Sequence, residues 1–199
     1  MALSQKKNQQ AIDYYAKAIQ MQPDYFKPQV QTGIALFNMG RKAEAEPYLK
    51  RGNELLPTAP GHALLGQIEE EHGNIDAALL DYQAAAGSDS DIGKQAGERA
   101  VRIDLPRNPA KYIESGPVAD SAGNLFAVVQ NDTGLSVGRV QVRVIKYDAQ
   151  TGQAVGQQQM IINGVQPGKR NQIAIGERIQ TPQEARLYKV VVEAAELAK

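Results

Sequence analysis

Two histidines and a run of three glutamates have the spacing that best suits metal chemistry in this chain. His62 and His72 lie ten residues apart, and Glu69, Glu70 and Glu71 stand next to the second histidine. Glu69 and His72 are three residues apart, which places them on one face of a helix. A zinc site needs three or four converging ligands, and the pattern is more typical of a solvated acidic helix end. We therefore predict no metal site.

Residues for covalent or cofactor-dependent catalysis are also poorly placed. The chain has no cysteine, which excludes thiolate nucleophiles, thiolate zinc sites and disulfides. No serine stands in a nucleophile-elbow setting, and neither a GxGxxG nor a Walker sequence occurs. Asp89 and Asp91 lack the remaining ligands of a calcium loop, and we interpret Asp91 as the N-cap of a helix. We predict no catalytic residue, no cofactor and no enzymatic activity of this chain.

Composition argues against two further classes of partner. Lys plus Arg and Asp plus Glu both number 22, so the chain has no net charge to attract nucleic acid. No apolar run approaches the roughly 18–20 residues that a membrane span requires. The N-terminal sequence MALSQKKNQQ lacks the apolar core of a signal peptide. We therefore predict no nucleic acid partner and no membrane span.

Similar residues recur in the first half of the chain with a period of about 34. The three copies are Ala11-Tyr15-Pro23, Ala45-Leu49-Pro57, and a weaker one with Gly66, Ala78, Tyr82 and Ala85. Such a period predicts a solenoid of helical hairpins. The apolar periodicity predicts helices at about 8–22, 26–39, 42–55, 61–72, 75–86 and 91–102. We interpret the last of them as the cap that the end of a solenoid requires.

This pattern resembles tetratricopeptide repeats, in which small residues on both helices of a hairpin accompany an aromatic residue and a closing proline. The copy that matches best contains Gly33, Leu36, Ala45, Leu49, Gly52 and Pro57. The resemblance implies a short α-solenoid whose function is to bind another protein or a peptide.

The first copy of the repeat is only half present. Its second helix is intact, but only a few residues precede it, so Tyr14, Tyr15 and Ile19 would lack a helix to pack against. Burying one such side chain is worth roughly 1.5–3 kcal/mol. We expect the chain to be a fragment of a longer protein, or to self-associate through this exposed first helix.

The periodicity changes from helical to alternating after Leu105. β-Branched residues then follow a period of two, as in residues 140–144, and turn sequences separate about six or seven short strands. One turn, Asn131-Asp132-Thr133, also fits a glycosylation sequon, but we interpret it as turn chemistry. We predict a tetratricopeptide α-solenoid in residues 1–105 and an immunoglobulin-like antiparallel β-sandwich in residues 106–199.

The order of these two parts is similar to the C-terminal region of bacterial periplasmic zinc metallopeptidases related to the β-barrel assembly-enhancing protease. The zinc-binding HExxH helix of that family lies upstream of this region. This chain has no HExxH, because His62 and His72 are followed by Ala63 and Gly73, so no catalytic residue is carried over. The resemblance implies a periplasmic location, with a cytoplasmic one as the alternative.

Tetratricopeptide repeats present the first helix of each hairpin on a concave face. By that spacing, the groove is lined by Lys27, Val30, Ile34, Phe37 and Asn38, and in the next repeat by Ala63, Gln67, Glu70 and Glu71. Apolar anchors with an acidic corner would suit an extended or helical segment with apolar residues and a basic end. The alternative is that some of these residues, above all Ile34 and Phe37, belong to the core between repeats.

We therefore interpret the chain as a non-catalytic interaction module that binds a polypeptide segment in a helical-repeat groove. A second hypothesis is the regulatory or substrate-recruiting C-terminal region of a zinc metallopeptidase, with the catalytic domain outside this chain. A third is a structural protein that assembles into stable oligomers.

Overall fold

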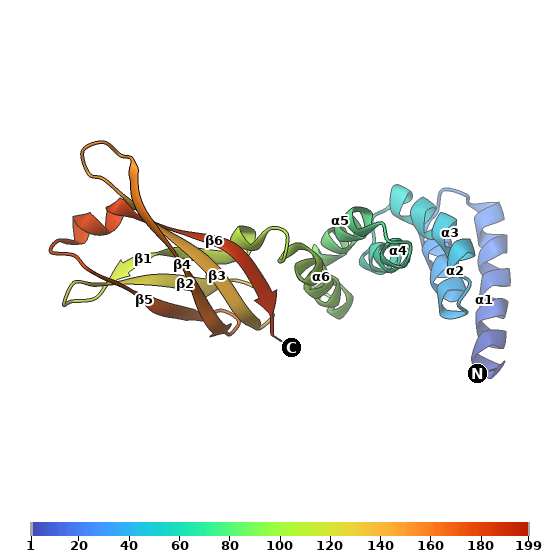
Figure 1. Ribbon diagram of the computed structural model, residues 1–199. Helices are drawn as coiled ribbons and strands as arrows, with labels where there is room; N and C mark the ends of the chain where they lie inside the picture. The colour runs from blue at the N-terminus through green and yellow to red at the C-terminus, as the bar shows by residue number, and fades with distance from the viewer. Residues whose placement is uncertain (1, 199) are drawn as a thin grey trace. The chain divides into compact units, whose positions relative to one another are not determined.

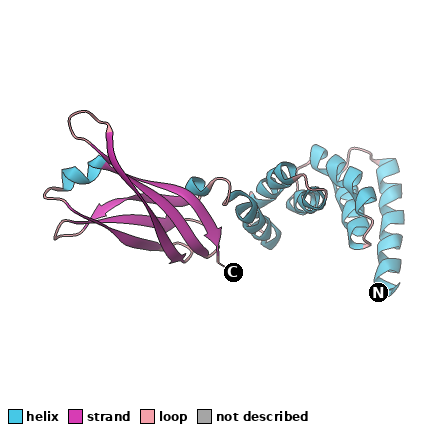
Figure 2. Ribbon diagram, in the orientation of Figure 1, coloured by secondary structure: helices cyan, strands magenta, loops and turns pink. Residues whose placement is uncertain are grey.

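The chain folds into two compact units of different secondary structure. The computed structural model describes residues 2–198, and their side chains from residue 5 onward. Contacts within the chain define the units as Met1–Ala100 and Val101–Lys199. Helices make up the first unit and antiparallel sheets the second (Figure 2). This order of a helical region followed by a β region is the order that the periodicities predict.

Within residues 2–198, six α-helices follow one another before the first strand (Figure 1). They are α1 (Ala2–Met21), α2 (Phe26–Asn38), α3 (Lys42–Leu55), α4 (Ala59–Glu71), α5 (Ile75–Ala86) and α6 (Asp91–Asp104). The sequence placed each of them within two residues of these limits, except that α1 begins at Ala2 and not near residue 8. Ser90 caps α6, since its Oγ accepts a hydrogen bond from the amide of Gly93 at 3.1 Å. The prediction of Asp91 as that N-cap was therefore wrong, because Asp91 is already the first residue of the helix.

Glycines explain why the helices pair with a repeating geometry. A Cβ added to Gly33 of α2 would lie 2.5 Å from Leu49 of α3, and one added to Gly66 of α4 would lie 2.8 Å from the Tyr82 ring of α5. A larger residue in either glycine position would push the paired helices apart. The turns repeat as well, since Gly40 and Gly73 end α2 and α4 with positive φ values of 77° and 79°.

The core of the helical unit is built from the recurring residues. Leu36, Ala45, Leu49, Leu65 and Ile68 form one buried cluster, and Ile12, Ile34, Phe37, Tyr48 and Leu64 pack against it half-buried. Ala45 and Ala78, which share a position in successive copies, are both 0% exposed. Helix α1 packs against α2, where Ile12 lies half-buried on the cluster, but Tyr14 and Met21 of the same helix stay exposed.

The described part of the second unit contains six strands in two antiparallel three-stranded sheets. Two short 3₁₀ helices, η1 (Pro109–Lys111) and η2 (Pro182–Leu187), precede the first and the last strand. One sheet has the order β1 (Ile113–Ala119), β2 (Asn124–Asn131), β5 (Arg170–Arg178), and the other β4 (Ala154–Val165), β3 (Val137–Tyr147), β6 (Tyr188–Leu197). β3 and β4 form a long hairpin, in which Gln141 is opposite Ile161.

The two sheets share one apolar core. Leu125, Ala127 and Val129 alternate with more exposed residues along β2, as a half-buried strand requires. They join a single buried cluster with Val140, Val142 and Val144 of β3 and with Val190 and Val192 of β6. The period of two in the sequence thus marks the buried faces.

Asn131 is the most completely bonded polar side chain of this core. It is 0% exposed, and its Nδ2 donates to the carbonyls of Leu135 at 2.8 Å and Val165 at 3.0 Å. Its Oδ1 accepts from the amide and the hydroxyl of Thr133. The interpretation of this sequon as turn chemistry is confirmed, since the amide nitrogen that would carry a glycan is buried and bonded.

Candidate functional site

A groove of about 360 Å³ lies on the helical unit, between side chains of alternate helices. It is lined from α2 by Ile34 and Asn38, from α4 by Pro60, Ala63, Leu64 and Gln67, from α5 by Tyr82, and from α6 by Ile92, Gln95, Ala96 and Arg99. Helices α2 and α4 are the first helices of successive hairpins, and α6 is the single helix that follows the second hairpin. The groove therefore follows directly from the way the hairpins stack.

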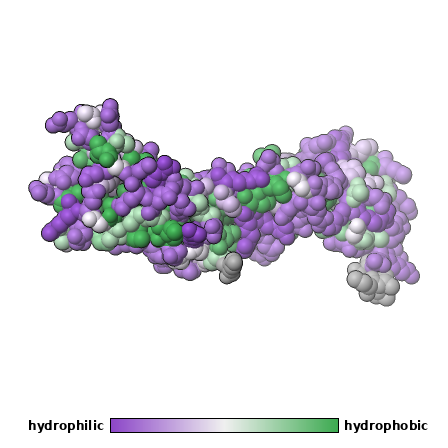
Figure 3. Space-filling model, in the orientation of Figure 1, coloured by the Kyte–Doolittle hydropathy of each residue, from purple (hydrophilic) through white to green (hydrophobic). Residues whose placement is uncertain are grey.

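The lining combines an apolar floor with unpaired amides. Ile34, Leu64 and Ile92 supply large apolar side chains, and Figure 3 shows hydrophobic surface over α5 and α6 on the face in view. Among the hydrogen bonds of the described side chains, none involves the amide groups of Asn38, Gln67 or Gln95. Binding sites are typically apolar with a few polar groups that fix the ligand's orientation, and this groove has that composition.

A hydrogen-bonded triad closes one side of the groove. The Tyr82 hydroxyl donates to Oε2 of Glu70 at 2.7 Å. Arg99 donates from Nη1 to that same Glu70 oxygen at 3.0 Å and to the Tyr82 hydroxyl at 3.1 Å. Burial, and then the Glu70 carboxylate, raise the pKa of Tyr82 well above its usual value. Tyr82 is thus a neutral hydroxyl at physiological pH, and it links two charges that compensate each other.

Four of the nine residues predicted to line the groove do so: Ile34, Asn38, Ala63 and Gln67. Val30 lies elsewhere, because it is 4% exposed and stands where a Cβ on Gly52 would meet it at 2.4 Å. Val30 therefore belongs to the packing between α2 and α3, and the prediction for this residue was wrong. Lys27 is exposed at the start of α2, outside the lining residues.

The side chains of Phe37 and Ile34 differ in whether they reach the groove. Phe37 packs against the buried cluster, with Nζ of Lys42 5.0 Å from the centre of its ring, and it does not line the groove. Ile34 packs against the same cluster and also lines the groove. The alternative that these two side chains are core holds in part for both, since each is half-buried against the cluster, and only Ile34 also lines the groove.

The expected acidic corner is neutralised by basic partners. Glu70 accepts a hydrogen bond from Arg99, and Glu71 forms an ion pair with Lys42. Neither partner is close in sequence to its glutamate, so the spacing along the chain could not show the pairing. A ligand with a basic end is therefore not favoured by this groove.

Helix α6 supplies lining residues that the sequence analysis assigned only to a cap. Ile92, Gln95, Ala96 and Arg99 follow the spacing i, i+3, i+4, i+7, which places them on one face of the helix. That spacing is visible in the sequence. A single helix without a second helix after it shows no hairpin period, so the sequence does not mark it as part of the groove.

The two histidines have separate surroundings. Nδ1 of His62 lies 2.8 Å from Oδ1 of Asp81, whereas His72 is the C-cap of α4. Oε2 of Glu69 accepts a hydrogen bond from Asn74 at 2.7 Å. Among the described residues no group of three histidine, aspartate or glutamate side chains is arranged to hold a metal ion.

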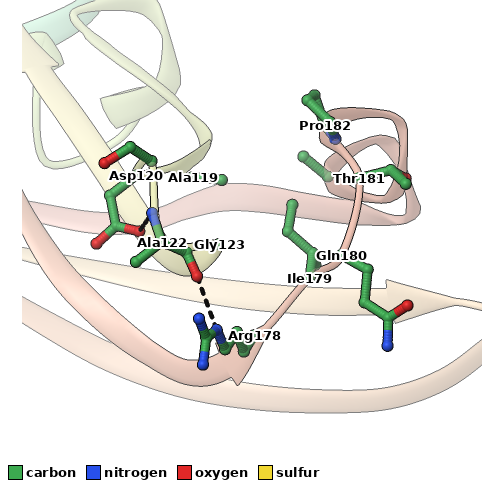
Figure 4. Close-up of a pocket in the computed structure, with 11 residues that line it drawn as sticks. Ala119, Asp120, Ala122, Gly123, Arg178, Ile179, Gln180, Thr181 and Pro182 are labelled. Carbon is green, nitrogen blue, oxygen red and sulfur yellow. Dashed lines mark hydrogen bonds between the residues drawn. The ribbon is translucent and has the colours of Figure 1, made fainter.

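A second hollow, of about 770 Å³, lies in the β unit between the β1–β2 turn and the end of β5 (Figure 4). Asp120 accepts hydrogen bonds from the amides of Ala122 and Asn124, and Nε of Arg178 donates to the carbonyl of Ala122 at 2.7 Å. Hydrogen bonds that Asp120 accepts from Asn124 lower the pKa of Asp120. These groups are used to hold the turn, and we assign no ligand to this hollow.

Comparison with known proteins gives a match in the first part of the helical region. A family model described as tetratricopeptide repeat matches residues 2–68, which include α1 to α3 and most of α4. Repeats of this class mediate interactions between proteins. A search of curated proteins gave no match. None of the helices in residues 2–198 is long and apolar enough to cross a membrane.

Proposed function

We propose that the groove between α2, α4 and α6 binds an extended, uncharged polypeptide segment through one or more apolar side chains. The observation that carries this proposal is the set of three unpaired amides, Asn38, Gln67 and Gln95, around an apolar floor. A peptide backbone offers one donor and one acceptor per residue. Side-chain amides supply both, so they can bond a backbone whatever its side chains are.

Affinity would come from the apolar floor and selectivity from charge. Ile34, Leu64 and Ile92 would be covered by the ligand, at about 25 cal/mol per Å² of apolar surface. Arg99 and Glu70 compensate each other, so a charged ligand side chain gains little there and loses hydration. We therefore propose that the segment is neutral where it enters the groove, and that this chain acts by binding and not by catalysis.

Peptide binding tests the proposal directly. Arrays of 12-residue peptides would select a sequence, and fluorescence anisotropy would give its Kd for the whole chain. Ile92→Glu places a charge in the groove at a side chain that is 42% exposed, so the fold is retained. We expect at least about a tenfold weaker Kd, since burying an unpaired charge costs more than 1.4 kcal/mol.

The matched control is Leu80→Glu, which makes the same kind of change at a 68% exposed leucine of α5 outside the groove. We expect it to leave the Kd unchanged. Equal weakening by both substitutions, or selection of only charged peptides, would contradict the proposed groove.

For the β unit we propose an immunoglobulin-like topology. The orders β1-β2-β5 and β4-β3-β6 support it, because they correspond to strands A-B-E and C′-C-F of that fold. On this assignment the edge next to β6 is where a further strand G would pair. An experimental structure whose sheet order differed from these two orders would exclude the assignment.

Each of the two other hypotheses from the sequence is supported by one feature. The order of helical repeats and β unit supports the hypothesis that the chain is a recruiting region of a periplasmic zinc metallopeptidase; cell fractionation and the gene sequence upstream would test it. Exposed Tyr14 (72%) and Met21 (83%) support self-association through α1. If α1 were the interface, Tyr14→Glu would lower the dimer fraction in light scattering and charge substitutions in the β unit would leave it unchanged.

A further inference from the structure

Strand β4 forms an edge of its sheet and carries no charged residue. It pairs with β3 only, and the sequence has no charged side chain from Ala149 to Gly168 although 22% of the chain is charged. At 12 residues it is also long for a strand. Natural proteins usually protect exposed edges with charges, prolines, short strands or bulges. β4 has no charge or proline and is not short, and its one irregularity is at Val155, which has no partner in β3.

The other edge strands of the β unit are protected. β1 contains Glu114 and Pro117, β5 contains Arg170 and Glu177, and β6 contains Lys189 and Glu193. The uncharged β2 lies between two partners in its sheet. Among the strands of the described residues, β4 is therefore the one uncharged strand with an open edge.

Only part of the outer edge of β4 is available for pairing with another strand. Nδ2 of Asn171 donates to the carbonyls of Asn163 and Gly164, both at 3.0 Å, and so covers the C-terminal part of β4. Within residues 2–198, no side chain bonds to the backbone of residues 154–162, and this segment is joined to β5 by the bond from Nε2 of Gln158 to the carbonyl of Ile175 at 2.9 Å. The segment available for pairing is thus 154–162, and its middle residue is Gln158.

The two exposed large apolar side chains of β4 lie at equal distances from that same residue. Val155 and Ile161, which are 61% and 40% exposed, lie three positions before and three after Gln158. If two copies of β4 pair antiparallel about Gln158, Val155 of each faces Ile161 of the other, and Gln157 faces Gln159. Cross-strand aliphatic pairs stabilise sheets, and like charges placed opposite each other destabilise them.

We propose that β4 is a dimerisation strand, which pairs antiparallel with β4 of a second copy about Gln158. The pairing would join two three-stranded sheets into a continuous six-stranded one, in the order β6-β3-β4-β4-β3-β6. Because the same segment is used on both sides, the contact is two-fold and closes at a dimer. The partner that this edge fits is another copy of the chain, since it offers an uncharged edge of equal length and matching side chains.

Charge substitutions at the two exposed apolar positions test the proposal. In the double variant Val155→Lys/Ile161→Lys, each lysine would face a lysine of the other copy, and in Val155→Glu/Ile161→Glu each glutamate would face a glutamate. We expect light scattering to show a dimer for the wild-type chain, with twice the 21.6 kDa mass, and monomers for both variants. In each variant, two aliphatic contacts between the copies are replaced by two like-charged pairs. We expect this to raise the Kd of the dimer at least about tenfold.

An equimolar mixture of the two variants is the matched control, because every lysine then faces a glutamate. We expect the mixture to form a one-to-one dimer. Circular dichroism should be unchanged in both variants, since both positions are exposed. A wild-type chain that stays monomeric at its highest soluble concentration would overturn the proposal, and so would a dimer that survives in the lysine variant.

Crosslinking tests the register. The chain has no cysteine, so Gln158→Cys would give a single thiol. Directly opposed residues of antiparallel strands have Cα atoms about 4.5–5.5 Å apart, which is within disulfide range. We expect a disulfide-linked dimer under mild oxidation from Gln158→Cys and little from Gln153→Cys. Equal crosslinking of the two would exclude pairing about Gln158.

Discussion

Arg99 of α6 and Tyr82 of α5 are joined by a hydrogen bond of 3.1 Å, with the guanidinium carbon 5.7 Å from the centre of the tyrosine ring. The same arginine reaches Glu70 of α4 at 3.0 Å. One side chain thus connects three helices at the side of the groove. The contact makes α6 part of the binding surface in addition to its place at the end of the helical stack.

Removal of the Tyr82 hydroxyl tests the energetic role of this triad. We expect Tyr82→Phe to lower the free energy of unfolding of the helical unit by about 1 kcal/mol, the net worth of a typical hydrogen bond. The ring would still pack on Gly66, so Tyr82→Ala should cost more, about 3–5 kcal/mol. Urea unfolding followed by circular dichroism measures both, and equal losses would contradict the separate roles of ring and hydroxyl.

The glycines at helix contacts should not tolerate a methyl group. In Gly33→Ala the new Cβ would lie 2.5 Å from Leu49, and we expect a loss of about 1–3 kcal/mol from overpacking. Gly97→Ala is the control, because its Cβ would meet only Ala86 at 3.4 Å and alanine favours a helix by about 1 kcal/mol. The midpoint temperature of thermal unfolding should therefore fall for Gly33→Ala and rise for Gly97→Ala.

Asp104 makes the stability of the β unit depend on pH in acid. It is 2% exposed, and it accepts hydrogen bonds from Asn108, Lys111 and Tyr112 at 2.6 to 2.7 Å. Burial works to raise the pKa of Asp104, but these bonds, led by that from Lys111, lower it from 3.8 to about 2.

Because the folded pKa is lower than the unfolded one, the stabilisation is present above about pH 4 and is lost as the pH falls to 2. The difference corresponds to about 2 kcal/mol. Urea unfolding between pH 5 and 2 should show this loss in the wild type and a smaller slope in Asp104→Asn. An equal slope in the variant would assign the acid sensitivity to other carboxylates.

Asn131 should be the polar residue whose loss most damages the β unit. Asn131→Ala would leave the buried carbonyls of Leu135 and Val165 without their donor, at a cost of about 3 kcal/mol or more. Asn124→Ala removes an exposed bond to Asp120 and should cost less than about 1 kcal/mol. Chemical unfolding of the two variants compares them, and similar losses would contradict the structural role of Asn131.

The sequence alone determined the parts whose cause is local. A small residue at Gly33 or Gly66 is needed wherever two helices of a hairpin touch, and a glycine such as Gly40 or Gly73 is needed where a helix ends in the left-handed region. These requirements repeat with the hairpin, so the period of the repeat was readable. Alternation along the strands was readable for the same reason, since successive side chains of a strand point to opposite faces.

Tertiary structure decided the rest, because those features depend on residues far apart in the chain. Glu70 meets Arg99 and Glu71 meets Lys42, each 29 residues away, and this removed the acidic corner that a linear reading expects. Val30 became core because Gly52 lies opposite it. An edge is defined by which strands pair and not by the strand's own residues, so the open edge of β4 became visible only when the sheet was assembled.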